Sequence, residues 1–131
     1  MIGLDTAVLV RYLTQDHPAQ SRAAGEVIEG AAGRGERLGV AAVTLCELVW
    51  VLESAYGRDR ADIGAALEQL ARTADVELEH AELVRQAIAA YRAGRVDFAD
   101  VLVGLVNEAA GCEVTVTFDK ALRRLPQFRV L

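Results

Sequence analysis

Residues 2–13 read IGLDTAVLVRYL, and the change of pattern within this stretch decides the fold. Residues 2–4 form a short apolar run typical of a buried strand, whereas residues 6–13 carry apolar side chains at helical spacing. Asp5 lies at the junction. A strand that passes directly into a helix begins a βαβ unit, so the stretch predicts a parallel sheet covered by helices.

The same alternation recurs along the whole chain. Further strand-like runs cover residues 38–43, 76–79, 113–118 and 128–131, and helical patterns cover residues 18–28, 44–56, 60–72, 80–93 and 98–110. Continuous apolar runs such as LGVAAV at 38–43 suit the buried strands of parallel sheets. We therefore predict an α/β fold in one domain, residues 1–131: a three-layer α/β/α sandwich around a central, mainly parallel sheet of four to five strands.

Composition narrows the classes of function. The 131 residues are 53% hydrophobic, enough for one core, and the net charge of −5 argues against a protein that holds nucleic acid by overall positive charge. Bound divalent ions could still reverse that charge locally. Cys46 and Cys112 lack CxxC spacing, which predicts two buried thiols rather than a zinc site. With no basic leader and no membrane-spanning apolar stretch, the chain is expected to be cytoplasmic, with no membrane partner.

Acidic residues recur where predicted strands meet helices. They are Asp5, Glu47, Asp97, Asp100 and Asp119. The carboxyl ends of parallel strands lie on one edge of a sheet, where ligands bind, so these acids should converge. Clustered carboxylates repel one another unless a cation neutralises them, and hard oxygen ligands favour Mg²⁺ or Mn²⁺. Asp97 and Asp100 are one helical turn apart, and Gly104 continues their face and should leave room beside them.

A purely structural explanation competes with this one. Acids are favoured in the first turn of any helix, where the dipole is positive and N–H groups lack partners. For a single acid, helix capping is a stronger explanation than metal binding. For the whole set of acids, helix capping is the weaker explanation, because Ser, Thr or Asn could cap a helix equally well.

Four segments carry a resemblance to a known family. In their order along the chain, these segments resemble the PIN-domain family of metal-dependent ribonucleases, and within it most of all the VapC toxins of toxin–antitoxin pairs. The segments are IGLDTAVLVRYLTQD, TLCELVWVL, DFADVL and VTFDK. The resemblance implies that Asp5, Glu47, Asp100 and Asp119 match the four family acids, with Asp97 beside Asp100. Asp5, Asp97, Asp100 and Asp119 would hold one or two Mg²⁺ or Mn²⁺ ions, and Glu47 would complete the catalytic pocket. The opening usually reads Asp-Thr-Asn, so Ala7 is a departure that puts the positioning of Asp5 in doubt.

The resemblance also implies partners: an RNA substrate, a cognate antitoxin and a second copy in a homodimer. The apolar helix around Trp50 is a candidate docking or dimer surface. Two alternatives stay open. One is a non-catalytic PIN-like module that binds a metal or a partner. The other is a phosphoacceptor receiver domain, which the order of the acids fits poorly.

Overall fold

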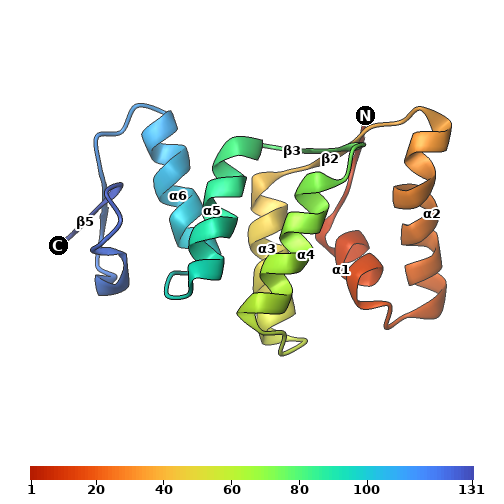
Figure 1. The fold of residues 1–131 in the computed structure, drawn as a ribbon, viewed down its shortest axis with the longest axis horizontal. Helices are drawn as coiled ribbons and strands as arrows, with labels where there is room; N and C mark the ends of the chain where they lie inside the picture. The colour runs from red at the N-terminus through yellow and green to blue at the C-terminus, as the bar shows by residue number, and fades with distance from the viewer.

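Strands and helices alternate through the whole molecule, which the computed structural model describes over residues 1–131 (Figure 1). The elements are β1 (Ile2–Gly3), α1 (Thr6–Thr14), α2 (Pro18–Arg34), β2 (Leu38–Val40), α3 (Ala42–Ser54), α4 (Arg60–Arg72), β3 (Val76–Leu78), α5 (Ala81–Ala93), α6 (Phe98–Ala109), β4 (Thr115–Thr117), the 3₁₀ turn η1 (Lys120–Leu122) and β5 (Phe128–Val130). The predicted α/β alternation is confirmed. None of the helices has the length and apolar character that crossing a membrane requires.

The strands form two separate parallel sheets. One has the order β1-β2-β3, with Ile2 paired to Leu38 and Leu38 to Val76, and the other consists of β4 and β5. The prediction of parallel strands is confirmed, but the single central sheet of four to five strands is not formed within this chain. Figure 1 shows why: helices α3 to α6 stand between β1 and the C-terminal strands. We call β4, η1 and β5 together the C-terminal unit.

One hydrophobic core of 27 buried residues runs from Leu4 to Leu122 and is built mainly by helices. The inner face of α3 includes Leu45, Leu48 and Leu52, as its spacing predicts. Trp50, on the opposite side of α3, is 68% exposed. The helix is thus apolar on a buried face and also on an open one.

Several element boundaries differ from the predictions, and those of α2 and α3 differ for identifiable reasons. Helix α2 continues past Gly30 to Arg34 because the Arg34 guanidinium lies over Gly30, where a side chain would clash, and donates to the carbonyl of Val27 at 2.7 Å. Gly35, with φ of 66°, then ends the helix in the left-handed conformation that glycine favours. Helix α3 begins at Ala42, earlier than predicted, so Glu47 lies in its second turn.

The prediction of two buried thiols is wrong in part. Cys46 is half-buried against α6, but Cys112 is exposed in the turn after that helix, and both are free. Apolar neighbours in sequence did not bury Cys112, because Gly111 ends the packed part of α6 with φ of 102°.

Candidate metal centre

Helix α6 begins with two carboxylates that do not cap it. Asp97 is the N-cap residue, yet its side chain makes no capping hydrogen bond, and Asp100 follows in the first turn. Helix α4 begins with the same acid spacing, and there Asp59 accepts a hydrogen bond from the N–H of Asp62 at 2.8 Å. The two acids are spaced identically in both helices, but the first acid caps α4, whereas the first acid of α6 makes no capping hydrogen bond.

Asp119 joins these two acids from the C-terminal unit. The pKa of Asp100 is raised by burial and then by the negative charges of Asp97 and Asp119. None of these three carboxylates has an ion pair with a basic side chain. The structure thus brings together three of the five predicted site residues as a patch of uncompensated negative charge.

The loop after β4 fixes the position of Asp119. Its N–H donates to the Thr117 hydroxyl at 3.0 Å, and its Oδ1 accepts from the N–H of Ala121 at 2.9 Å. Thr117 therefore orients the backbone of the acid. One Asp119 carboxylate oxygen caps η1 and the other is left without a partner.

The C-terminal unit is packed onto α6 through Gly104. The Phe128 ring lies where a side chain at Gly104 would be, so the room expected beside the acids is filled by an aromatic ring. The Asn107 amide also donates to the Thr115 hydroxyl at 3.1 Å, which ties α6 to β4. These contacts hold Asp119 close to the first turn of α6.

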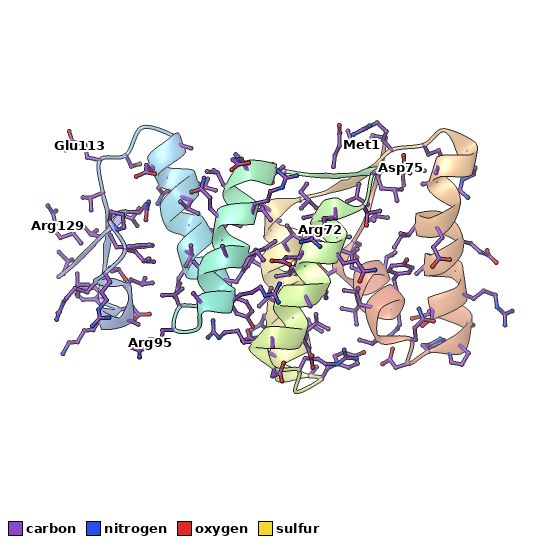
Figure 2. All side chains as sticks on the ribbon, in the orientation of Figure 1. Met1, Arg72, Asp75, Arg95, Glu113 and Arg129 are labelled. Atoms are coloured by element: carbon purple, nitrogen blue, oxygen red, sulfur yellow. The ribbon has the colours of Figure 1, made fainter.

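Arg60 holds the turn that leads into Asp97. Its guanidinium donates to the carbonyls of Tyr91 at 3.0 Å and Val96 at 2.6 Å, and it lies 4.3 Å from the centre of the Tyr91 ring. Figure 2 places Arg95, within the same turn, at the lower edge of the molecule beside the C-terminal unit. Sequence reasoning missed Arg60, because more than thirty residues separate it from its acceptors.

Removing this guanidinium should loosen the approach to Asp97. We expect Arg60→Ala to lower the free energy of unfolding by about 1–3 kcal/mol, because buried carbonyls lose a charged donor. Arg58→Ala is the matched control, since the Arg58 side chain is exposed and makes no hydrogen bond. Urea denaturation followed by circular dichroism gives the unfolding free energies of both variants. Equal unfolding free energies would show that Arg60 does not stabilise this turn.

Asp5 lies apart from the other acids, and Glu47 lies on α3, which packs against α6. Asp5 is exposed and caps α1, accepting from the N–H of Thr6 at 2.8 Å, and Figure 1 shows α3, α4 and α5 between α1 and α6. Glu47 is exposed and makes no hydrogen bond or ion pair. Burial, and then the charge of Asp97, raise the pKa of the thiol of the neighbouring Cys46.

As placed in one chain, no three acidic, histidine or cysteine side chains enclose a common ion position. The Thr6 hydroxyl beside Asp5 is buried without a hydrogen-bond partner. The acids that the sequence places in one site therefore form one cluster of three at α6 and two separate carboxylates at α1 and α3.

Basic side chains concentrate near the cluster. Residues 113–131 contain four basic and two acidic residues, a net +2 in a chain of −5. Lys120, Arg123 and Arg124 follow Asp119 directly, are exposed, and have no ion pair. By contrast, Arg11 is engaged with Asp16, and Arg92 with Glu68 at 2.6 Å.

Comparison with known proteins identifies the family. The model of the PIN domain matches residues 2–127, nearly the whole chain. The chain belongs to the PIN-domain family. This PIN domain is also 27% identical to a protein named VapC ribonuclease from Aquifex aeolicus (strain VF5), over 122 residues that cover 93% of this chain and 90% of that protein. No solved structure matches it.

The family match confirms the resemblance drawn from the four sequence segments and sets aside the receiver-domain alternative. It agrees with the observed α/β fold and its parallel strands.

Proposed function

We propose that this PIN domain is a VapC-like, metal-dependent endoribonuclease and the toxin of a toxin–antitoxin pair. The observation that carries the proposal is the convergence of Asp97, Asp100 and Asp119 without a basic partner, beside a locally basic C-terminal unit. Acids alone would repel a phosphodiester. Once the acids hold a cation, the cation and the nearby arginine and lysine side chains would together attract the phosphodiester.

The oxygen donors of the cluster have the chemistry that a hard divalent cation requires, although in this chain no three of them enclose one ion position. Burial, and then the charges of Asp97 and Asp119, raise the pKa of Asp100, and no basic side chain forms an ion pair with these acids. Carboxylate oxygens are the ligands that Mg²⁺ and Mn²⁺ prefer. Asp97, Asp100 and Asp119 would hold one or two such ions, with Asp5 as a further ligand and Glu47 as ligand or proton acceptor. When bound, the ions would supply charge neutralisation and activate water for phosphodiester hydrolysis.

Other side chains of the protein would bind the RNA and keep the acids in position. Lys120, Arg123 and Arg124 would bind the RNA backbone, Arg by its two-pronged contact with phosphate and Lys as a point charge. Arg95, in the turn before Asp97, would do the same from the other side of the cluster. Thr117 and Arg60 would keep Asp119 and Asp97 in position through the hydrogen bonds that fix their backbones.

The test is cleavage of a total RNA pool by the purified chain with Mg²⁺, with Mn²⁺ and with a chelator. The Asp5→Asn variant should fold normally, because Asp5 is exposed and Asn caps helices well, but lose at least about 100-fold in cleavage. Metal-dependent fragments that disappear in Asp5→Asn support the proposal. Folded, inhibitor-free protein that cuts nothing under either metal would instead favour a non-catalytic PIN module.

The toxin role implies an antitoxin that blocks the acidic cluster. The open apolar face of α3 and α6, defined by Val43, Trp50 and Val103, supports this part of the proposal because each of these side chains is at least half exposed. Trp50→Glu should weaken antitoxin binding measured by calorimetry, while its unfolding free energy stays within about 0.5 kcal/mol of the parent.

A further inference from the structure

A hollow opens between helices α1 and α2, which lie side by side at one end of the molecule (Figure 1). Its volume is about 350 Å³, and most of its lining is apolar, whereas Arg11 and Gln20 supply its polar side chains. The N–H of Val8, which also lines it, donates to the carbonyl of Asp5 at 3.1 Å. An apolar hollow with a few polar groups, one helical turn from Asp5, has the character of a small-ligand pocket.

Helical spacing builds the two walls of this hollow. Ala7 and Arg11 lie one turn apart on α1, and Gln20, Ala23 and Val27 follow one face of α2. Ala7 and Ala23 are exposed and end at a methyl group, so the hollow is open to solvent between them. A longer side chain at either position would occupy it.

Arg11 is held in one orientation at this hollow. Its Nε donates to Gln20 Oε1 at 2.8 Å, and its Nη1 donates to the Tyr56 hydroxyl at 3.0 Å and to Asp16 at 3.2 Å. Hydrogen bonds from Tyr56 and then from Thr14 lower the pKa of Asp16 to about 2, so this carboxylate stays ionised and balances the arginine. Arg11 is therefore a fixed hydrogen-bond donor rather than a free positive charge for phosphate.

The side-chain groups left without a partner at the hollow are both donors. Gln20 Oε1 accepts from Arg11, which fixes the orientation of the amide, and the Gln20 Nε2 group makes no hydrogen bond. Arg11 Nη2 also has no acceptor, although the side chain is 31% exposed. A ligand that satisfies this pair must present two neighbouring acceptor atoms.

We infer that the hollow binds an unpaired guanine base of the RNA substrate, with Arg11 Nη2 and Gln20 Nε2 donating to its O6 and N7 atoms. The base lies against the methyl groups of Ala7 and Ala23. Single-stranded RNA is recognised in this way, through splayed bases read on their exposed edges. The inference rests on the proposed ribonuclease function, and it makes the cut depend on a guanine at a fixed position beside it.

The donor pair and the apolar walls exclude other occupants. Adenine presents an amino donor beside N7, and the two carbonyls of uracil are separated by an N–H donor, so each sets a donor against a donor. Cytosine has neighbouring acceptors, but its single ring covers less of the apolar wall than the double ring of guanine. An apolar segment of a protein partner would leave both donors buried and unsatisfied.

Titration with uncharged nucleosides tests the inference without metal and without cleavage. Guanosine, adenosine, cytidine and uridine are added separately to the ¹⁵N-labelled chain, and amide shifts are followed by NMR. Guanosine should move the Gln20 side-chain amide signal and bind about 10-fold more tightly than the others, since a two-donor contact discriminates between bases by about this factor or more. Preference for another nucleoside, or no binding of any, overturns the inference.

Gln20→Glu should reverse the preference from guanosine to adenosine. The carboxylate keeps an oxygen for Arg11 and replaces the free amide donor with an acceptor, which suits the amino group of adenine. The change should fold, because an acid in the first turn of α2 is favourable. Gln86→Glu on α5 is the matched control: Gln86 is exposed, lies outside the hollow, and should retain the guanosine preference. A preference that Gln20→Glu leaves unchanged contradicts the assignment.

Ala23→Leu tests the space itself and leaves the residues next to Asp5 unaltered. It should weaken guanosine binding at least about 10-fold while the helical circular dichroism spectrum stays the same, because leucine favours helix and Ala23 is exposed. Undiminished binding by a folded Ala23→Leu chain would place guanosine elsewhere and overturn the inference.

Mapping of the cut ends in a total RNA pool separates this inference from the proposed function. The parent chain with Mg²⁺ or Mn²⁺ should leave guanine at one fixed position beside the cut, and Gln20→Glu should leave adenine there. Cleavage without a fixed guanine would overturn the base pocket and keep the ribonuclease. Guanosine binding by a chain that cuts no RNA would keep the base pocket and refute the ribonuclease function.

Discussion

Replacing Asp100 with Asn should lower metal-dependent RNA cleavage by at least about 100-fold, because loss of a direct metal ligand should exceed the roughly 10–100-fold cost of losing an outer partner. Burial, and then the charges of both Asp97 and Asp119, raise the pKa of Asp100, so both of the other acids lie near it. Isothermal titration with Mn²⁺ should show a matching loss of affinity. The substitution preserves shape, and it removes one of three negative charges.

The same variant should be at least as stable as the parent chain when no metal is present. Burial, and then the charges of Asp97 and Asp119, raise the pKa of Asp100, so its ionised form is disfavoured in the folded protein. A neutral side chain at this position removes both costs. Because the site is largely solvent-screened, we expect a rise in Tm of about 1–3 °C at most. Added Mn²⁺ should raise the Tm of the parent and not that of Asp100→Asn.

Asp62→Asn provides a matched control for this prediction. Asp62 occupies in α4 the position that Asp100 occupies in α6, three residues after an acidic N-cap. It should lose about 0.3–1 kcal/mol of helix stabilisation and leave cleavage unchanged. If Asp62→Asn and Asp100→Asn reduced cleavage equally, a metal role specific to α6 would be untenable.

The contrast between these two helices shows where sequence reasoning succeeds and where it fails. Helical patterns predicted both helices, over residues 60–72 and 98–110, and an acid, two residues and a second acid favour a first turn in either case. Whether the first acid then caps the helix depends on its surroundings. Asp59 finds the N–H of Asp62, whereas Asp97 follows a turn that Arg60 holds from another helix.

The sheet also shows that local sequence predicts an element but not how it packs. Each strand was predicted from its own run of apolar or alternating β-branched residues, and all five exist. Whether β4 reaches β1 depends instead on where α5 and α6 pack. Gly104 illustrates the point, since its missing side chain serves the Phe128 ring rather than a metal. Residue types predicted the acids of the site, but packing between helices determined which of them meet in one chain.

The packing that positions the cluster should itself be costly to disturb, and Phe98→Ala tests this. Phe98 follows Asp97, is fully buried, and meets the Tyr91 ring edge to face with ring centres 6.2 Å apart. Removing its ring leaves a cavity between α5 and α6, so the free energy of unfolding should fall by about 3–5 kcal/mol. That is a large share of the roughly 5–15 kcal/mol that stabilises a domain, and Tm should fall by roughly 10–20 °C.

Trp50→Ala removes an even larger ring from an exposed position and should change the unfolding free energy by no more than about 0.5 kcal/mol. Both variants are measured by urea denaturation with circular dichroism, because Trp50 is the only tryptophan and fluorescence would be lost. If Phe98→Ala lowered the free energy of unfolding as little as Trp50→Ala, the Phe98 ring would not anchor the turn before α6. The positions of Asp97 and Asp100 would then depend on Arg60 alone, and Arg60→Ala would be the variant that dissolves the site.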